Sequence, residues 1–285
     1  MPPIFEIVPN VSEGRDASIV DACADAIAGT GARVIHRTSD PAHHRSVITA
    51  VGTQREVLDA AIALTGVTTR RIDLRTHRGE HPRIGALDVL PFVPLRGATL
   101  EDAVALARQA ATIIWERYRV PSFFYGAAAT TPARRLLANV RRGEFEGLTQ
   151  RMQDPSDRPD VGDLPHAAAG AIAIGARDFL VAFNVDLASD DLDLARAIAK
   201  TLRERSGGLG TLRALGVRRG PGVVQVSFNI TDFGATPLYR VVELVRALAA
   251  EHGAGIVRSE LIGLIPRRAL LETAAYYAGA ERART

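Results

Sequence analysis

The stretch Asp178-Phe-Leu-Val-Ala-Phe-Asn-Val185 decides the fold, because a strand pattern begins again there after a long polar interruption. From this strand onward, the spacing of apolar residues predicts one series of the order βαββαβ. Its elements are expected at 178–185, 191–203, 212–217, 223–230, 237–250 and 255–261, with a final helix after Pro266. That order is the split βαβ arrangement of ferredoxin-like folds.

The first half of the chain begins with the same series. Its opening strand, 4–8, ends in Val8-Pro9-Asn10-Val11, much as the later strand ends in Ala182-Phe183-Asn184-Val185. Further strands are expected at 33–37, 46–51, 87–93 and 121–125, and helices at 16–28, 55–63, 99–117 and from Thr131. The sequence therefore predicts an α/β (α+β) protein with two ferredoxin-like βαββαβ-type subdomains, 1–176 and 177–285, and a cleft between them.

The segment 152–169 lies between the two series and is the clearest loop of the chain. It is rich in Asp, Pro and Gly, and it is longer than the usual connection between elements. Long loops of this kind in compact proteins are often functional. A plain linker is the alternative interpretation.

Composition narrows the class of protein. The 285 residues suffice for two domains, and 47% apolar with 24% charged residues is ordinary for a globular chain. No apolar run reaches the roughly 18 residues of a membrane span, and the first residues lack a signal-peptide pattern, so a cytoplasmic protein is expected. Charges are scattered around a net value of +3, which is not the footprint of a nucleic-acid-binding surface. The single cysteine, Cys23, excludes an intrachain disulfide and a cysteine-based zinc cluster.

The densest polar cluster is Thr76-His77-Arg78-Gly79-Glu80-His81-Pro82-Arg83. A histidine with a pKa near neutrality can accept a proton and return it in one turnover. We assign that role to His81, which follows an acidic residue and precedes a proline that restricts the backbone. Glu80 is expected to tune His81 or to hold a cationic substrate, and Arg78 and Arg83 are candidates for binding carboxylates.

The same residues match the H-x-x-E-H signature of an inverted zinc peptidase. That signature requires a helix that places both histidines on one face. Gly79 weakens a helix and Pro82 disfavours helical geometry at His81, so no metal site is predicted here.

A second polar cluster, 40–45, lies where a turn between two strands is expected. Asp40 and Arg45 are predicted to face the same pocket as His81, and a solvated hairpin turn is the alternative. Asn and Asp also stand at three expected strand ends, where turn formation is their commonest role. If these residues serve the site, Asn10, Asn184 and Asp232 are candidates for substrate binding.

Five segments in order along the chain resemble glutamate formiminotransferases. The most specific is Gly79-Glu80-His81-Pro82-Arg83-Ile84-Gly85-Ala86-Leu87-Asp88-Val89, and the others are 5–15, 175–184, 225–233 and 259–266. The chain departs from the family pattern at His44, where relatives commonly carry Asn, and at Ala169, where they often carry Trp. The cyclodeaminase domain that is fused to some relatives is not expected, since the sequence stops at Thr285.

The resemblance implies transfer of a formimino group from N-formimino-L-glutamate to N5 of tetrahydrofolate, a co-substrate, in histidine degradation. It implies two α/β subdomains with a cleft, a homodimer, and no metal. The catalytic histidine of the family falls on His81. The folate-contacting loop falls on Gly162, Asp163, Leu164, Pro165, His166, Ala167, Ala168, Ala169 and Gly170.

The residues suit that chemistry, because one histidine can move a proton from the attacking N5 to the departing glutamate nitrogen. The amidinium of the donor is positively charged, so Glu80 or Asp40 is expected to stabilise it. Arg45, Arg78 and Arg83 are expected to bind the carboxylates of glutamate and of the folate tail. The alternatives are a related folate-dependent formyl transferase, a 5-formyltetrahydrofolate cycloligase, and a folate-binding protein without turnover.

Overall fold

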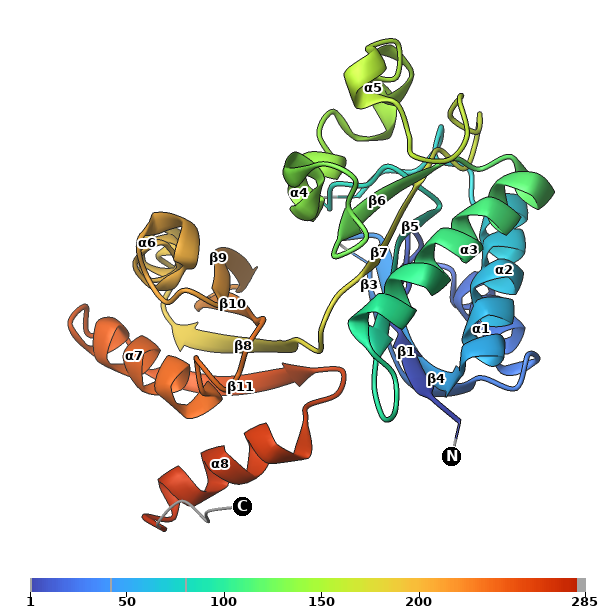
Figure 1. Ribbon diagram of the computed structural model, residues 1–285. Helices are drawn as coiled ribbons and strands as arrows, with labels where there is room; N and C mark the ends of the chain where they lie inside the picture. The colour runs from blue at the N-terminus through green and yellow to red at the C-terminus, as the bar shows by residue number, and fades with distance from the viewer. Residues whose placement is uncertain (1, 42, 80, 281–285) are drawn as a thin grey trace. The chain divides into compact units, whose positions relative to one another are not determined.

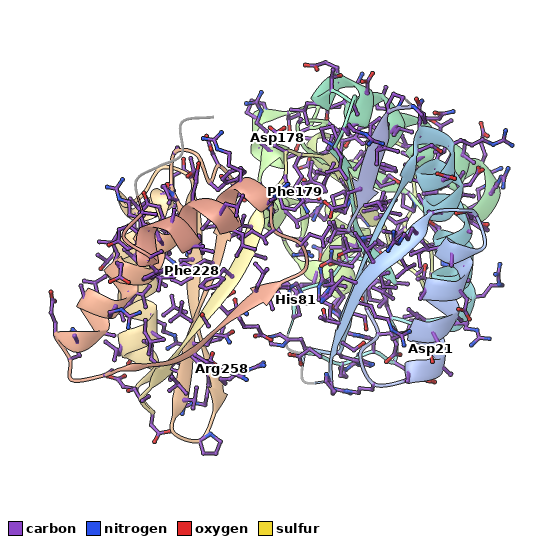
Figure 2. All side chains as sticks on the ribbon, turned by 90° about the horizontal axis from the view of Figure 1, so that it is seen from below. Asp21, His81, Asp178, Phe179, Phe228 and Arg258 are labelled. Atoms are coloured by element: carbon purple, nitrogen blue, oxygen red, sulfur yellow. The ribbon has the colours of Figure 1, made fainter. Side chains whose placement is uncertain are left out.

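The structure is a computed structural model that describes residues 2–41, 43–79 and 81–280 (Figure 1). It consists of two compact units, 1–178 and 179–285, whose boundary falls between Asp178 and Phe179 (Figure 2). Each unit contains one β-sheet with helices packed on it, which confirms the predicted mixed α/β class with two subdomains. The cleft between the units stays a prediction. No helix in the described ranges is long and apolar enough to cross a membrane.

The first unit is built on a seven-stranded sheet. Its strands are β1 (Ile4–Ile7), β2 (Asn10–Val11), β3 (Arg33–Asp40), β4 (Arg45–Thr53), β5 (Leu87–Pro94), β6 (Ser122–Gly126) and β7 (Ile172–Ala176). The strand order is β1-β4-β2-β5-β7-β6, with β3 paired to the outer side of β4. The pairs β5–β7 and β6–β7 are parallel and the others are antiparallel.

Three helices cover one face of this sheet: α1 (Ala17–Ala28), α2 (Gln54–Arg71) and α3 (Leu100–Tyr118) (Figure 1). They enclose the main core, in which Phe5, Ile48 and Phe92 are fully buried. A capping box begins α3, since Asp102 Oδ2 accepts from the Thr99 N–H at 2.9 Å and the Thr99 hydroxyl accepts the Asp102 N–H at 3.2 Å. The helix α2 extends well beyond the predicted 55–63, because its buried face continues to Thr68.

Short elements cover the other face, where one helix was predicted from Thr131. They are η1 (Pro132–Arg135), α4 (Leu137–Val140), α5 (Glu144–Arg151) and η2 (Pro155–Asp157). The prediction of a single helix was wrong, because Leu136 is extended (φ −92°, ψ 117°) and Gly143 has a φ of 79°, so the helical path is broken twice. Val140 and Leu148 from these elements pack on the sheet residue Phe123 to form a second, smaller core. The strand β7 was not predicted at all.

The second unit has the predicted βαββαβ order. Its elements are β8 (Val181–Ala188), α6 (Leu192–Leu202), η3 (Glu204–Ser206), β9 (Leu212–Gly220), β10 (Val223–Ile230), α7 (Leu238–Ala250), β11 (Ile256–Ile262) and α8 (Arg267–Tyr277). The sheet order is β11-β8-β10-β9, and all neighbouring strands are antiparallel. Helices α6 and α7 pack on the sheet around Phe228, which Figure 2 labels.

Candidate active site

The predicted histidine cluster lies in the connection from α2 to β5, where Figure 2 labels His81. Residues 77–79 and 81–83 are not helical, so the helix that the zinc-peptidase signature requires is not formed by them. Glu80 lies outside the described residues. The connection packs tightly on the β3–β4 turn, since a Cβ at Gly79 would lie 2.5 Å from the His43 carbonyl oxygen. The two polar clusters of the sequence, 40–45 and 76–83, are therefore neighbours.

His77 and His44 hold these two segments together. Their rings stack with centroids 4.1 Å apart and 7° between the planes. His77 Nε2 donates to the His44 carbonyl at 3.1 Å, and Arg83 Nε donates to His77 Nδ1 at 3.2 Å. Because Nδ1 accepts, His77 is a neutral imidazole with its proton on Nε2. Burial lowers the pKa of His77, which also favours the neutral form of its ring.

His44 links this stack to the N-terminal segment of the unit. Its Nδ1 lies 3.0 Å from the Arg78 carbonyl oxygen and its Nε2 lies 3.0 Å from Glu13 Oε1. The same Glu13 oxygen accepts the backbone N–H groups of Gly14, Arg15 and Asp16. Glu13 thus fixes the segment after β2, and neither His44 nor His77 is free for proton transfer.

His81 differs from both, because one of its nitrogens is available. Its Nδ1 donates to the Pro82 carbonyl oxygen at 2.7 Å, and a carbonyl can only accept. The proton therefore sits on Nδ1, and Nε2 presents its lone pair with no hydrogen-bond partner among the described residues. The ring of His43 lies edge-on at a centroid distance of 6.2 Å. An imidazole nitrogen with a free lone pair is what a general base requires, and in His81 that nitrogen is Nε2.

The charge around His81 is positive. Burial, and then the guanidiniums of Arg45 and Arg141, lower the pKa of His81 to about 3. The free imidazole is accordingly neutral throughout the physiological range. Protonating it needs either a nearby anion or a proton transfer coupled to the reaction.

Both guanidiniums bind the same carboxylate, and we call Asp88, Arg45 and Arg141 the Asp88 cluster. Asp88 Oδ2 accepts from Arg45 Nη1 at 2.7 Å and from Arg141 Nη2 at 2.6 Å, and Oδ1 accepts the Ile84 N–H at 2.8 Å. Asp88 is fully buried. Burial would raise its pKa, but the charges of Arg141 and Arg45 outweigh this effect and lower the pKa to about 2.

The expected substrate-binding residues of the first unit occupy different positions. Asn10 Oδ1 accepts from Arg45 Nη2 at 2.6 Å, so Asn10 orients the Asp88 cluster. Arg78 is exposed, and its Nη1 donates to the His77 carbonyl at 2.7 Å. Asp40 Oδ1 accepts the backbone N–H of His43 at 2.9 Å, and Asp40 Oδ2 lies 3.0 Å from Nδ1 of the His43 ring.

Arg83 is buried and is engaged within the protein. Besides its bond to His77 Nδ1, it donates to the His77 carbonyl, to Glu144 and twice to Glu146. These five contacts account for the five N–H groups of a guanidinium. Arg83 therefore anchors the His81 segment to α5, and it has no donor left for a substrate.

The predicted folate loop is held beside the His81 segment. Leu74 donates to the Ala168 carbonyl at 2.9 Å and Ala86 donates to the Ala169 carbonyl at 2.9 Å, so the loop is bonded before and after residues 76–83. His166 Nδ1 accepts the N–H groups of Ala168 and Ala169 and rigidifies the turn. Near the tip of the loop, Leu164 is 68% exposed.

Asn184 and Asp232 belong to the second unit. Asn184 was expected at a strand end but lies in the middle of β8, opposite Ser227 of β10, because β8 continues to Ala188. Asp232 Oδ1 accepts the N–H groups of Gly234 and Ala235 and forms a turn. Their contacts with a substrate stay predictions.

Three further residues contribute to the site but were not predicted from the sequence: Asp88, Arg141 and Glu13. Asp88 gave a signal, because a lone acid within the apolar strand 87–93 is unusual unless it is paired. Glu13 stood in the quoted 5–15 segment without a role. Arg141 gave no signal, since it meets Asp88 from 53 residues away in sequence.

Comparison with known proteins identifies relatives along the whole chain. The family model "Formiminotransferase domain, N-terminal subdomain" matches residues 4–177, and "Formiminotransferase domain" matches residues 182–285. The chain is 40% identical over 280 residues to the glutamate formimidoyltransferase of Streptococcus pyogenes serotype M1, covering 97% of this chain and 94% of that protein. It is 41% identical over 278 residues to the glutamate formimidoyltransferase of Thermoplasma acidophilum, covering 96% and 92%.

The chain also matches part of a longer relative. The formimidoyltransferase-cyclodeaminase of Rattus norvegicus is 38% identical over 291 residues, which cover 99% of this chain and 54% of that protein. The resemblance predicted from the sequence motifs is thereby confirmed.

Proposed function

This chain belongs to the formiminotransferase family of enzymes, and from that premise we propose its reaction. It transfers the formimino group of N-formimino-L-glutamate to N5 of tetrahydrofolate, giving 5-formiminotetrahydrofolate and L-glutamate. The proposal extends to a role in histidine degradation, a cytoplasmic location and a homodimeric enzyme.

The observation that carries this proposal is the tautomer of His81. With Nδ1 donating to the Pro82 carbonyl, Nε2 is an unprotonated nitrogen in a segment fixed on both sides. His81 Nε2 accepts the proton that N5 loses as the new C–N bond to the formimino carbon forms. It then returns that proton to the glutamate nitrogen as the old C–N bond breaks, so the proton count is unchanged over the turnover.

Tetrahydrofolate supplies the acceptor nitrogen, and the folate loop fits a role in holding it. The loop is bonded to Leu74 and Ala86 on either side of the His81 segment, and Leu164 presents apolar surface. We assign contacts with tetrahydrofolate to residues 162–170 on this basis. Holding both substrates beside one proton carrier accounts for a large share of the expected rate acceleration.

The remaining residues support the donor. Asp40 and Glu80 are proposed to stabilise the amidinium, and Arg45 and Arg78 to bind carboxylates. Arg83 acts indirectly, because its N–H groups are bonded to Glu144, Glu146 and His77. Asn10 acts through Arg45, and Asn184 and Asp232 are proposed to contact the substrates from the second unit.

A two-substrate turnover assay tests the proposal. Purified protein is mixed with N-formimino-L-glutamate and tetrahydrofolate, and both products are followed for the wild type, His81→Ala and the control His252→Ala. His252 is exposed in the second unit. We expect turnover in the wild type and the control and at least a 100-fold loss in His81→Ala. A folded wild type without turnover contradicts the proposal, and turnover of N-formyl-L-glutamate alone reassigns the donor.

A further inference from the structure

We propose that Arg141 binds the α-carboxylate of the glutamyl donor. Arg141 is the member of the Asp88 cluster that keeps most of its N–H groups unused. The inference rests on the proposed function, because it says how the donor of that reaction is held. It concerns how the site recognises its donor, and it assigns a role to Arg141, which lies outside the sequence segments that resemble the family.

The charge of the Asp88 cluster favours an anionic ligand. Two guanidiniums share the Oδ2 atom of one carboxylate, and Oδ1 is taken by the Ile84 N–H. One positive charge is left over. The side chains of Arg45 and Arg141 are only 9% and 13% exposed. A nearly buried net charge is costly unless an ion of opposite sign joins it.

Most of the unused hydrogen-bond donors of the cluster lie on Arg141, because Arg45 uses three of its five N–H groups and Arg141 uses one. Arg45 bonds Asp88 through Nη1 and Asn10 through Nε and Nη2. Arg141 makes one bond, from Nη2 to Asp88, and its buried Nε has no partner among the described residues. The planar fork of a guanidinium with unused N–H groups is suited to a carboxylate, which it can bind through both oxygens.

The chemistry of the donor decides which carboxylate this is. The reacting nitrogen is bonded to the α-carbon, so the α-carboxyl carbon lies about 2.5 Å from it. The glutamate nitrogen that His81 protonates therefore has the α-carboxylate next to it. The Asp88 cluster lies beside the His81 segment, because Asp88 Oδ1 accepts the N–H of Ile84, three residues after His81, at 2.8 Å. The charges of both guanidiniums lower the pKa of His81, in keeping with that position. In contrast, the carboxylates of the folate tail are separated from N5 by C6, the methylene–amine bridge and the aminobenzoyl group.

Binding of this carboxylate also makes His81 a better base. The positive charges of Arg45 and Arg141 help to lower the pKa of His81, and a carboxylate on the cluster offsets one of them. The pKa of His81 then rises when the donor is bound. The proton acceptor is thereby strengthened in the complex in which it is needed.

A binding experiment without turnover tests the inference. Calorimetry measures N-formyl-L-glutamate, a stable analogue of the donor, against the wild type, Arg141→Gln, Arg141→Lys and the control Arg142→Gln. Arg142 is the next residue, and its side chain is 73% exposed. We expect binding to weaken about 10- to 100-fold in Arg141→Gln, less in Arg141→Lys, and not in the control. Circular dichroism shows whether each variant is folded.

A second ligand identifies the carboxylate. The α-carboxamide of N-formyl-L-glutamate is expected to bind the wild type as weakly as the parent compound binds Arg141→Gln. That variant is expected not to discriminate between the two compounds. Discrimination retained in Arg141→Gln overturns the inference, and so does unchanged affinity in that variant. Failure of the wild type to bind the analogue, with or without tetrahydrofolate, overturns it as well.

Turnover separates this inference from the proposed function. If the wild type turns over and Arg141→Gln raises the KM for tetrahydrofolate but not for the donor, only the inference fails. If the analogue binds as expected and the wild type does not turn over the donor, only the proposed reaction fails. Histidine NMR adds a readout that a structural role would not move, because the analogue is expected to raise the pKa of His81 in the wild type and not in Arg141→Gln.

Discussion

Arg83 Nε lies 3.2 Å from His77 Nδ1, and this contact joins α5 to the stacked pair of His77 and His44. Since Glu144 and Glu146 hold the same guanidinium, the segment that carries His81 is fixed at both ends. His77 and His44 therefore have a structural role, because they hold the segment that carries His81 in place.

Replacing Arg83 with methionine is expected to loosen that framework. The change removes five hydrogen bonds and leaves the buried His77 Nδ1 without a donor, which costs about 2 kcal/mol of unfolding free energy. We expect kcat to fall more than tenfold, because His81 is no longer held in place. Urea unfolding and steady-state kinetics measure the two effects. The exposed pair of Arg196 and Asp193 provides the control, Arg196→Met. Equal kinetics for both variants would contradict the proposed anchoring role.

Gly79→Ala is expected to displace the His81 segment from the β3–β4 turn. A Cβ at this position would meet the His43 carbonyl oxygen at 2.5 Å and His44 Cβ at 2.8 Å, and the backbone oxygen cannot easily move. A shift of about 1 Å in a catalytic segment can cost about 100-fold in rate. Gly147→Ala in α5 is the matched control, since apart from the backbone of its own helix no described atom lies within 4 Å of its added Cβ. Full activity of Gly79→Ala would show that the turn tolerates displacement.

Much of the fold was readable from the sequence, for reasons that differ between elements. The strands and helices of the second unit alternate buried and exposed positions clearly, so their order was predicted correctly. The strand β7 is buried at all five positions and is built from Ile, Ala and Gly, so it has no alternation to detect. The path after Thr131 depends on the conformation of Gly143, which periodicity does not report.

The residues of the candidate site also differ in how far they could be predicted from the sequence. Its local parts, His81 and the polar residues around it, are adjacent in sequence and were recognised as a cluster. The long-range parts were not, because the Arg141–Asp88 ion pair and the Arg83–Glu146 ion pair form only once α4 and α5 fold onto the sheet. Arg83 was predicted to bind the substrate for this reason, since the acids that pair with it, Glu144 and Glu146, lie over 60 residues away in sequence.

The pH dependence of catalysis is expected to lack an ionisation of His81 near its ordinary pKa. Burial with Arg45 and Arg141 lowers that pKa to about 3 in the free enzyme. The kcat/KM profile reports the free enzyme, so it should show no acid limb from this group between pH 5 and 8. Histidine NMR of the wild type, assigned by comparison with His81→Gln, measures the pKa directly. A His81 pKa near 6.5 without substrate would contradict the electrostatic account of the site.

Glu6 provides a prediction for stability, because it is a buried carboxyl on β1 with 3% exposure. Burial raises its pKa to about 7 against the opposing charge of Arg177, whereas the unfolded chain titrates this group near 4.5. The folded state thus binds the proton more tightly. The stability that this provides is complete below about pH 4.5 and is lost as the pH rises through about 7. At pH 8 the ionised group therefore destabilises the fold by about 3 kcal/mol.

Glu6→Gln is accordingly expected to stabilise the protein at pH 8 and to have little effect at pH 4.5. Urea unfolding of the wild type and the variant at both values measures the difference, and the exposed Glu116→Gln serves as the control. Because other groups titrate in the same range, the informative quantity is the change in the variant's advantage between the two pH values. An advantage of equal size at both would show that Glu6 affects stability through packing and not through its charge.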